Sequence, residues 1–241
     1  MIRTILILLG ALCACDPPGD GDPAAAPVPP AVPRRDRDVM CPAPDGGIAA
    51  SLYEPDGPAT TAVLVDVGAR MWDRWGDLPD GPAFSHYREL AEALQDTGVA
   101  VLLYDKRGTG HTLGHPPGTP GRIRDSLAAR ACLARLVPGA RIVRVGHSAG
   151  SAVACHAWAP GERLVLLSPV VNPGEMPDAP TLIVRGEADG GRAADDARLA
   201  AHPETRWVGV PGANHLLRVE GRVAPEALAA VTAFVTAGSP P

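Results

Sequence analysis

The chain lacks a dense run of lysine and arginine, and beyond its first residues it lacks a long apolar segment. Its 241 residues carry a formal net charge of −5. Proteins that bind nucleic acid usually carry a basic patch, so this composition argues against a nucleic-acid partner. A membrane-spanning helix needs about 18 consecutive apolar residues, and no later segment approaches that length. There is no internal repeat, and the hydrophobic content of 46% is enough for the core of one globular domain.

The first residues, MIRTILILLGALCAC, have the organisation of an export signal. Arg3 supplies a positive charge, Ile5 to Leu12 form a short apolar stretch, and small residues lead to Cys15. A plain secretory signal has this pattern. The segment Leu12 to Cys15 also resembles a bacterial lipobox. That resemblance implies that residues 1–14 are a signal peptide and that Cys15 carries a lipid anchor in the mature protein.

Residues 15–40 are predicted to be a tether, and residues 41–241 a single folded domain. The segment from Asp16 to about Arg37 is rich in proline, alanine and aspartate and has few large apolar side chains. Such a composition favours an extended chain and cannot form a core. A lipid anchor followed by this spacer would hold a soluble domain clear of the membrane surface.

Three cysteines, Cys41, Cys132 and Cys155, remain when Cys13 of the predicted signal peptide and the lipid-bearing Cys15 are set aside. In an oxidising compartment this odd number predicts one disulfide and one free thiol. The sequence leaves the pairing open.

From Ile48 onward, short apolar runs alternate with segments of helical period. This alternation is typical of an α/β domain with a mainly parallel sheet covered by helices on both faces. The expected strands are Ala62 to Val67, Val99 to Tyr104, Ile142 to Val145, Leu164 to Leu167, Thr181 to Val184 and Trp207 to Val210, with residues 48–54 in an antiparallel edge strand. The expected helices are Phe84 to Gln95, Ile123 to Leu136, Ala149 to Trp158, Arg192 to Ala201 and Pro225 to Val235.

The stretch GHSAG, residues 146–150, lies where an expected strand turns directly into a helix. A Gly-x-Ser-x-Gly elbow holds its serine in a strained turn, and the two glycines are needed because a Cβ would crowd the adjoining strand or helix. The N–H groups at the start of the following helix suit a developing oxyanion. We therefore interpret Ser148 as a nucleophile, with a plain turn residue as the alternative.

A serine nucleophile needs a base, and the base needs an orienting acid. His215 follows the strand that ends at Val210, and Asp189 follows the strand that ends at Val184. Glu187, two residues before Asp189, is a rival for the role of the acid. The chain order serine, aspartate, histidine is that of the α/β-hydrolase triad.

The segment from Ile48 to the C-terminus resembles the α/β-hydrolase family. The stretches LVDVGARMWDRWGD, LLYDKRGTG, VGHSAGSAV, IVRGEAD and PGANHLL occur in the family's order. The resemblance implies the α/β-hydrolase fold, a serine hydrolase activity, and no metal or cofactor. It also implies an oxyanion hole formed by the backbone N–H groups of Ala149 and of a residue in the loop after the first central strand.

In that loop the chain departs from the family pattern, which commonly has a His-Gly pair. Here the residues are Val67, Gly68 and Ala69, and by register Ala69 supplies the second N–H. Because the donor is a backbone group, its side chain need not matter. Because of this departure, the sequence does not show which groups hold the loop by hydrogen bonds.

Only residues 168–180 separate the strand ending at Leu167 from the next one, where the family commonly inserts a cap domain. So short a segment, rich in proline, cannot form a helical lid, so we expect no large cap and an open pocket. Trp72 and Trp75 are candidates for its wall, with ordinary packing as the alternative. An open pocket buries little of a long acyl chain, which predicts a preference for short-chain esters.

The sequence therefore predicts a membrane-anchored, extracytoplasmic serine hydrolase that acts on small carboxylic esters. His111 and His115 have no third ligand nearby, so we expect no metal site. Two alternatives stay open, because a fold does not determine a chemistry. The same residues could serve an amidase, a peptidase or an acyltransferase, or the domain could be a non-catalytic binding module of a surface lipoprotein.

Overall fold

The computed structural model describes residues 36–69, 71–79, 81, 83–116, 118–190 and 193–238. The predicted signal peptide, Cys15 and most of the predicted tether lie outside these residues, so the lipid anchor stays a prediction. Among the helices that the structure describes, none is both long and apolar enough to cross a membrane.

The described strands form one eight-stranded sheet in the order β1-β2-β4-β3-β5-β6-β7-β8. Strands β1 and β2 run antiparallel to their neighbours, whereas the pairings from β4 through β8 are all parallel. The strands are β1 (Asp36–Cys41), β2 (Ile48–Tyr53), β3 (Thr61–Asp66), β4 (Ala100–Tyr104), β5 (Arg141–His147), β6 (Arg163–Leu167), β7 (Thr181–Gly186) and β8 (Thr205–Val210). The carboxyl ends of the parallel strands meet at one edge of the sheet, which is where ligands bind in such folds.

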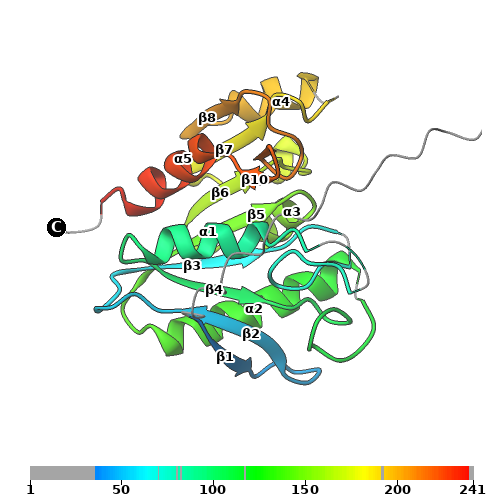
Figure 1. Cartoon of the computed structure of the whole chain (residues 1–241), viewed down its shortest axis with the longest axis vertical. Coiled ribbons are helices and arrows are strands. Elements are labelled where there is room, and N and C mark those ends of the chain that lie inside the picture. The colour runs from blue at the N-terminus through cyan, green and yellow to red at the C-terminus, as the bar shows by residue number, and fades with distance from the viewer. Residues whose placement is uncertain are drawn as a thin grey trace, which may run out of the picture. The chain divides into compact units, whose positions relative to one another are not determined.

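Helices cover both faces of the sheet (Figure 1). Helices α1 (His86–Gln95) and α5 (Pro225–Thr236) pack on one face, and α2 (Thr119–Leu136), α3 (Gly150–His156) and α4 (Ala193–Ala200) pack on the other. Along β3, Val63 and Val65 belong to the α1/α5 side of the core, whereas Ala62 and Leu64 belong to the α2 side. The central strands are apolar on both sides because both sides are buried, as the sequence predicts.

Each expected strand and helix is present, with ends that differ by a few residues. Helix α2 begins at Thr119 rather than at Ile123, because Pro120 fits the first helical turn, where its missing N–H costs nothing. A short ribbon of β9 (Arg218–Val219) and β10 (Arg222–Val223) was not expected. Between β6 and β7 the described chain forms only the 3₁₀ turn η1 (Pro173–Glu175), so the expected absence of a large cap is confirmed.

The boundary of the predicted tether at residue 40 is wrong, because Asp36–Cys41 form the edge strand β1. The sequence DRDVMC lacks the apolar character of the other strands, since β1 is held by pairing with β2 rather than by burial of both faces. A disulfide between Cys41 and Cys132 fastens the end of β1 to α2 and resolves the pairing that the sequence left open. Cys155 is free and buried in α3, and burial raises the pKa of its thiol to about 12.

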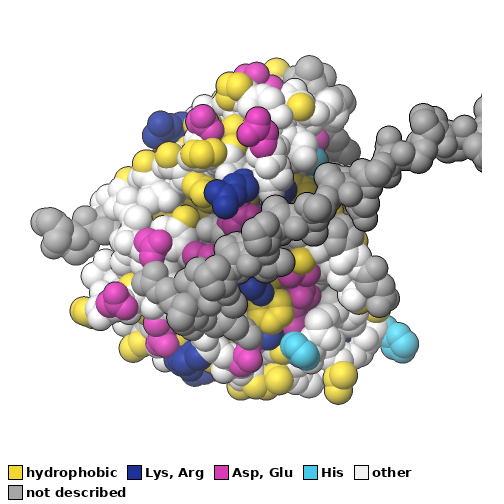
Figure 2. Space-filling view, viewed as in Figure 1, with side chains coloured by type: hydrophobic (Ala, Val, Ile, Leu, Met, Phe, Trp, Pro, Cys, Tyr) yellow, Lys and Arg dark blue, Asp and Glu magenta, His cyan; other side chains and the backbone are white. Residues whose placement is uncertain are grey.

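The described surface carries charges of both signs. On the face shown in Figure 2, acidic and basic side chains are interspersed. The exposed large apolar side chains among the described residues are Met40, Met71, Leu113, Leu127 and Val219. No patch of a single sign is visible among the described side chains of this face.

Candidate active site

Ser148 lies in the sharp turn between β5 and α3. Its backbone has a φ of 53°, a left-handed conformation that non-glycine residues rarely adopt. A Cβ on Gly146 would approach the Ser151 Cα to 2.6 Å, and a Cβ on Gly150 would overlap the Asp66 carbonyl oxygen. The Ser148 N–H donates to the Leu167 carbonyl at 2.9 Å, which ties the turn to β6. The strand–turn–helix context predicted for this serine, and the need for both glycines, are therefore present.

His215 and Asp189 lie at the carboxyl ends of β8 and β7 and contact each other directly. The His215 Nδ1 is 3.0 Å from both carboxylate oxygens of Asp189. Glu187 is exposed, and its carboxylate lies beside Gly209 of β8. Of the two acidic candidates that the sequence offers, Asp189 is the one that contacts the histidine.

The surroundings of Asp189 keep its carboxylate ionised. Burial raises the pKa of Asp189, but the hydrogen bond and charge of His215 and the ion pair with Arg185, at 2.8 Å, outweigh burial. The pKa therefore ends below its ordinary value. A carboxylate in this state accepts the Nδ1–H of His215 and leaves Nε2 free to take a proton.

The loop that carries His215 is held by backbone contacts and by an asparagine turn. The Ala188 N–H donates to the Ala213 carbonyl at 2.9 Å, which joins the loops after β7 and β8. The Asn214 Oδ1 accepts the N–H groups of Leu216 at 2.9 Å and Arg218 at 3.1 Å. In an Asx turn, an asparagine or aspartate side chain accepts hydrogen bonds from backbone N–H groups that follow it in the chain. The turn fixes the backbone on both sides of His215.

His147, the residue before Ser148, connects the elbow to the His215 loop. Its Nε2 is 3.0 Å from the His215 carbonyl oxygen, and its Nδ1 is 2.8 Å from the Tyr87 hydroxyl. A carbonyl only accepts, so Nε2 carries the proton and Nδ1 accepts from Tyr87. Burial lowers the pKa of His147 to about 4, so the ring is neutral at neutral pH. The Ser148 hydroxyl itself forms no hydrogen bond within the described residues.

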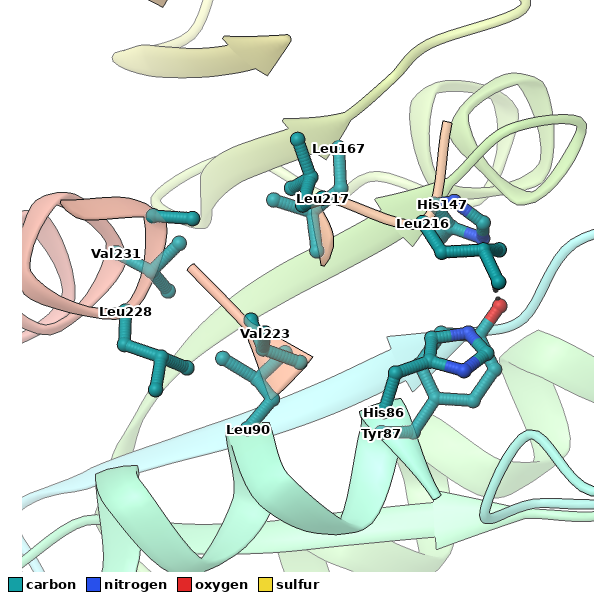
Figure 3. Close-up of a pocket in the computed structure, with 11 residues that line it drawn as sticks. His86, Tyr87, Leu90, His147, Leu167, Leu216, Leu217, Val223, Leu228 and Val231 are labelled. Carbon is teal, nitrogen blue, oxygen red and sulfur yellow. Dashed lines mark hydrogen bonds between the residues drawn. The ribbon is translucent and has the colours of Figure 1, made fainter. Parts of the chain in front are cut away.

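The segment Val67–Ala69, hereafter the oxyanion loop, passes beside the elbow. A Cβ on Gly68 would lie 3.5 Å from the Ser148 Cβ. The Gly68 N–H donates to the Tyr87 hydroxyl at 3.0 Å. The same hydroxyl donates to His147, as Figure 3 shows. Tyr87 therefore supplies the support for the loop that the sequence left open. Nothing in the spacing of Tyr87, on α1, indicates this contact.

Two cations bind the carbonyl groups of the same loop. The Lys106 Nζ donates to the Gly68 oxygen at 2.7 Å, and Arg122 donates to the Val67 oxygen at 2.6 Å. Lys106 lies two residues after the end of β4, and its side chain points back to the oxyanion loop.

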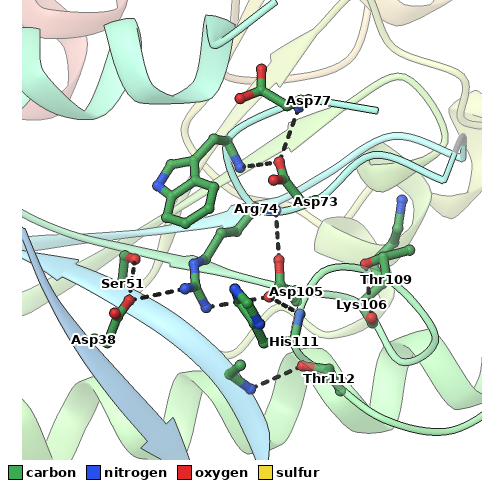
Figure 4. A network of polar contacts seen from close by, with 12 residues as sticks. Asp38, Ser51, Asp73, Arg74, Asp77, Asp105, Lys106, Thr109, His111 and Thr112 are labelled. Atoms are coloured by element: carbon green, nitrogen blue, oxygen red, sulfur yellow. Dashed lines mark hydrogen bonds and ion pairs between the residues drawn. The ribbon is translucent and has the colours of Figure 1, made fainter. Parts of the chain in front are cut away.

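Asp105 holds together the two loops that border the site (Figure 4). Its carboxylate accepts the Arg74 N–H at 2.7 Å and the His111 N–H at 2.8 Å, and pairs with the Arg74 guanidinium at 3.2 Å. Arg74 is buried and also pairs with Asp38 of β1 at 2.9 Å. The segments 71–79 and 106–116 are thus anchored to one carboxylate at the end of β4.

A small apolar cavity lies behind His147, between α1, α5 and the loop after β8 (Figure 3). It is lined mainly by Leu90, Leu167, Leu216, Leu217, Val223 and Val231, together with His86. The space open to the centre of a water molecule is about 20 Å³, which is room for one water. Trp72 is buried and stacks on His147 with ring centroids 6.0 Å apart, so it packs beneath the site rather than walling an open pocket.

Among the described residues, His, Cys, Asp and Glu side chains form no group of three or more that could hold a metal ion. His111 and His115 are both exposed.

Comparison with known proteins finds relatives in sequence and in structure. Residues 83–206 match the family model described as serine aminopeptidase, S33. Two uncharacterized proteins of Mycobacterium tuberculosis, from strains CDC 1551 and H37Rv, are each 32% identical over 230 residues. The match covers 80% of this chain and 78% of each relative.

Solved structures with the same fold include two hydrolases. The dienelactone hydrolase of Anabaena variabilis matches with a TM-score of 0.68 and 22% identity, over 84% of this chain and 98% of that chain. An α/β serine hydrolase of Xanthomonas campestris, described as being without a lid, matches with a TM-score of 0.68 and 18% identity. That match covers 88% of this chain and 100% of the other.

Proposed function

The chain belongs to the S33 serine aminopeptidase family and has the fold of the α/β serine hydrolases, and from that premise we propose that it cleaves carboxylic esters through Ser148, His215 and Asp189. The observation that carries this proposal is the contact between His215 and Asp189 beside the strained Ser148 elbow. An oriented base beside a partly buried turn serine is the arrangement that serine nucleophiles need.

In the proposed reaction the Ser148 oxygen attacks the acyl carbon while its proton passes to the His215 Nε2. The tetrahedral intermediate then collapses, the alcohol leaves with the proton from His215, and an acyl-enzyme remains on Ser148. Water attacks the acyl-enzyme with His215 again as base. The acid leaves, and the serine recovers its proton.

Asp189 serves this sequence by holding His215 in the tautomer with the proton on Nδ1. The carboxylate oxygens at 3.0 Å accept that proton, and the Arg185 ion pair keeps the carboxylate charged. The negative charge also stabilises the imidazolium that forms when Nε2 takes the serine proton.

The backbone N–H groups of Ala149 and Ala69 are proposed to stabilise the oxyanion. Ala149 directly follows the nucleophile, and Ala69 ends the oxyanion loop that runs beside the Ser148 Cβ. Loss of one such donor typically costs about 10²- to 10³-fold in kcat.

We propose small, short-chain esters as the substrate class. The short connection between β6 and β7 provides no lid, and the cavity behind His147 has room for one water rather than a long acyl chain. Each CH₂ left in water forgoes about 0.8 kcal/mol of transfer free energy. The structural neighbour from Anabaena variabilis is named for hydrolysis of a dienelactone, and a lactone is a cyclic ester.

Amide or peptide hydrolysis is the second candidate, because the family model is described as a serine aminopeptidase. The same groups could attack an amide carbonyl, with His215 protonating the leaving amine. The identity of the leaving group therefore separates the two candidates.

The membrane anchor on Cys15 is also a proposal, which rests on the segment Leu12 to Cys15 and the tether after it. It places the enzyme on the outer side of a membrane, periplasmic or at the cell surface. The Cys41–Cys132 disulfide supports such an oxidising location.

The test measures kcat/KM for p-nitrophenyl acetate, butyrate and palmitate and for an aminoacyl p-nitroanilide. We expect acetate and butyrate to be preferred, and Ser148→Ala to retain less than about a hundredth of the activity, since loss of a triad nucleophile costs several orders of magnitude. Ser151→Ala, which removes a neighbouring hydroxyl bonded to the Gly146 carbonyl, is the matched control and should keep most of the activity. Faster cleavage of the anilide than of the esters would favour the peptidase, and an active Ser148→Ala would refute the nucleophile.

A further inference from the structure

Lysine is almost absent from this chain. Lysine and arginine together number 22, and Lys106 is the single lysine among them. Its side chain is buried, with a residue exposure of 6%, and its Nζ donates to the Gly68 carbonyl at 2.7 Å. The one lysine of the chain therefore lies in a buried place, where it contacts the oxyanion loop.

The Gly68 carbonyl belongs to the same peptide group as the Ala69 N–H. In a trans peptide these two groups point in opposite directions within one plane, and the described residues contain no cis peptide. A donor that fixes the oxygen therefore also fixes the direction of the N–H. A positive charge at the oxygen polarises the group further and strengthens the N–H as a donor.

We propose that Lys106 is a positioning residue for ester hydrolysis, whose ammonium group orients and polarises the Gly68–Ala69 peptide so that the Ala69 N–H can stabilise the oxyanion. The inference rests on the proposed function, because it concerns the oxyanion hole of the same site. Arg122 reaches the same Gly68 oxygen at a longer distance, 3.4 Å, so Lys106 makes the shorter contact. Tyr87 holds the preceding peptide through the Gly68 N–H.

The charge on Lys106 is sensitive to pH. Burial and, to a smaller extent, the charge of Arg122 on α2 lower the pKa of Lys106 to about 7, against the opposing effects of Asp105 and Asp73. From β5, His147 faces the lysine as a neutral ring. Below pH 7 the ammonium form prevails, and the charge is lost as pH rises through 7. The polarisation of the Ala69 N–H, and with it kcat, should therefore fall on the alkaline side.

An arginine at this position would behave differently. Its guanidinium stays protonated across the range in which enzymes work, whereas a buried lysine titrates. In Lys106→Arg the alkaline loss of kcat should disappear, while the activity at pH 6 stays within about tenfold of wild type. Lys106→Met should lower kcat by about tenfold or more at pH 6, where wild type carries the charge, with a smaller difference on the alkaline side, and should leave KM within about twofold, since a weakened oxyanion donor acts on the transition state.

The pH profile of kcat and KM for wild type, Lys106→Arg and Lys106→Met tests this directly. Arg107→Lys is the matched control, because Arg107 is adjacent in sequence but pairs with Asp125 rather than with the oxyanion loop, and it should keep the wild-type profile. An alkaline limb that persists in both Lys106 variants, or a Lys106→Met enzyme with wild-type kcat, would overturn the inference.

A second measurement needs neither a variant nor activity. The full chain labelled with [¹³Cε]-lysine gives one lysine signal, because there is one lysine. We expect that signal to titrate with a midpoint near pH 7, at the same pH at which kcat falls on the alkaline side. A midpoint near the ordinary lysine value of about 10.4 would overturn the pH dependence, since the ammonium group would then keep its charge through the range in which kcat is expected to fall.

The two proposals fail in different ways. If a fluorophosphonate labels Ser148 while the Lys106 variants behave as wild type, the inference on Lys106 is wrong and the proposed function stands. If wild type neither reacts with the probe nor hydrolyses esters, the proposed function is wrong and the inference is wrong with it.

Discussion

Replacement of Tyr87 by phenylalanine removes the hydroxyl that links the oxyanion loop to the elbow. In wild type this hydroxyl accepts the Gly68 N–H at 3.0 Å and donates to the His147 Nδ1 at 2.8 Å. Gly68 and His147 are both buried, so bulk solvent does not reach either contact. The ring keeps its packing in the core, and the variant isolates the loss of the two hydrogen bonds.

The size of the effect follows from the two groups left without a partner. An unsatisfied buried donor or acceptor costs about 1 to 3 kcal/mol, so the free energy of unfolding should fall by about 2 to 6 kcal/mol. Native domains have about 5 to 15 kcal/mol in total, so the variant should fold but with a much smaller margin. The oxyanion loop also loses its anchor on the N–H side, and kcat should fall more than KM rises.

Urea unfolding and ester hydrolysis measure the two effects on the same preparation. With an m value of about 3 kcal/mol per M, a loss of 2 kcal/mol lowers the midpoint by about 0.7 M. Tyr53→Phe is the matched control, because Tyr53 lies on β2 in the same core and is equally buried; it should cost less stability and leave kcat unchanged. A Tyr87→Phe protein with the midpoint and kcat of wild type would refute the link between the loop and the elbow.

Asp189→Asn should lower kcat far more than Glu187→Gln, because only Asp189 contacts His215; the reverse order in the two purified variants would assign the acid to Glu187. Reduction of the Cys41–Cys132 disulfide, which closes a loop of 91 residues, should destabilise the domain by about 4 to 5 kcal/mol, and a melting temperature unaffected by reductant would contradict this. Cys15→Ser should move the protein from the membrane fraction to the soluble fraction of cells, and an unchanged membrane fraction would disprove the lipid anchor.

Much of the fold could be predicted from the sequence because the buried strands are apolar at most of their positions. Runs such as Ala62 to Val67 and Leu164 to Leu167 have no other stable place than the centre of a covered sheet. The turn at Ser148 could be predicted because its two glycines are required by local geometry. Strand β1 was not predicted because half of its residues are charged and it is held by pairing and a disulfide rather than by its own apolar pattern.

The hydrogen bonds that hold the oxyanion loop could not be predicted from the sequence, for a different reason. Tyr87 and Lys106 reach Gly68 from positions 19 and 38 residues away, and such contacts depend on how α1 and β4 pack against β3. Neither side chain has a neighbour in sequence that indicates a catalytic role. Trp72 is a similar case. The sequence offers it as a candidate for the wall of the pocket, but in the structure its ring stacks on His147.

The central claim is that Ser148 is an activated nucleophile, and covalent labelling with a fluorophosphonate tests it most directly. Intact mass and peptide mapping should find one adduct per chain, located on Ser148, and none on Ser148→Ala. Labelling of His215→Ala should be strongly slowed, because the base that removes the serine proton is gone. A wild-type chain that stays unlabelled, or an adduct on another serine, would contradict the account.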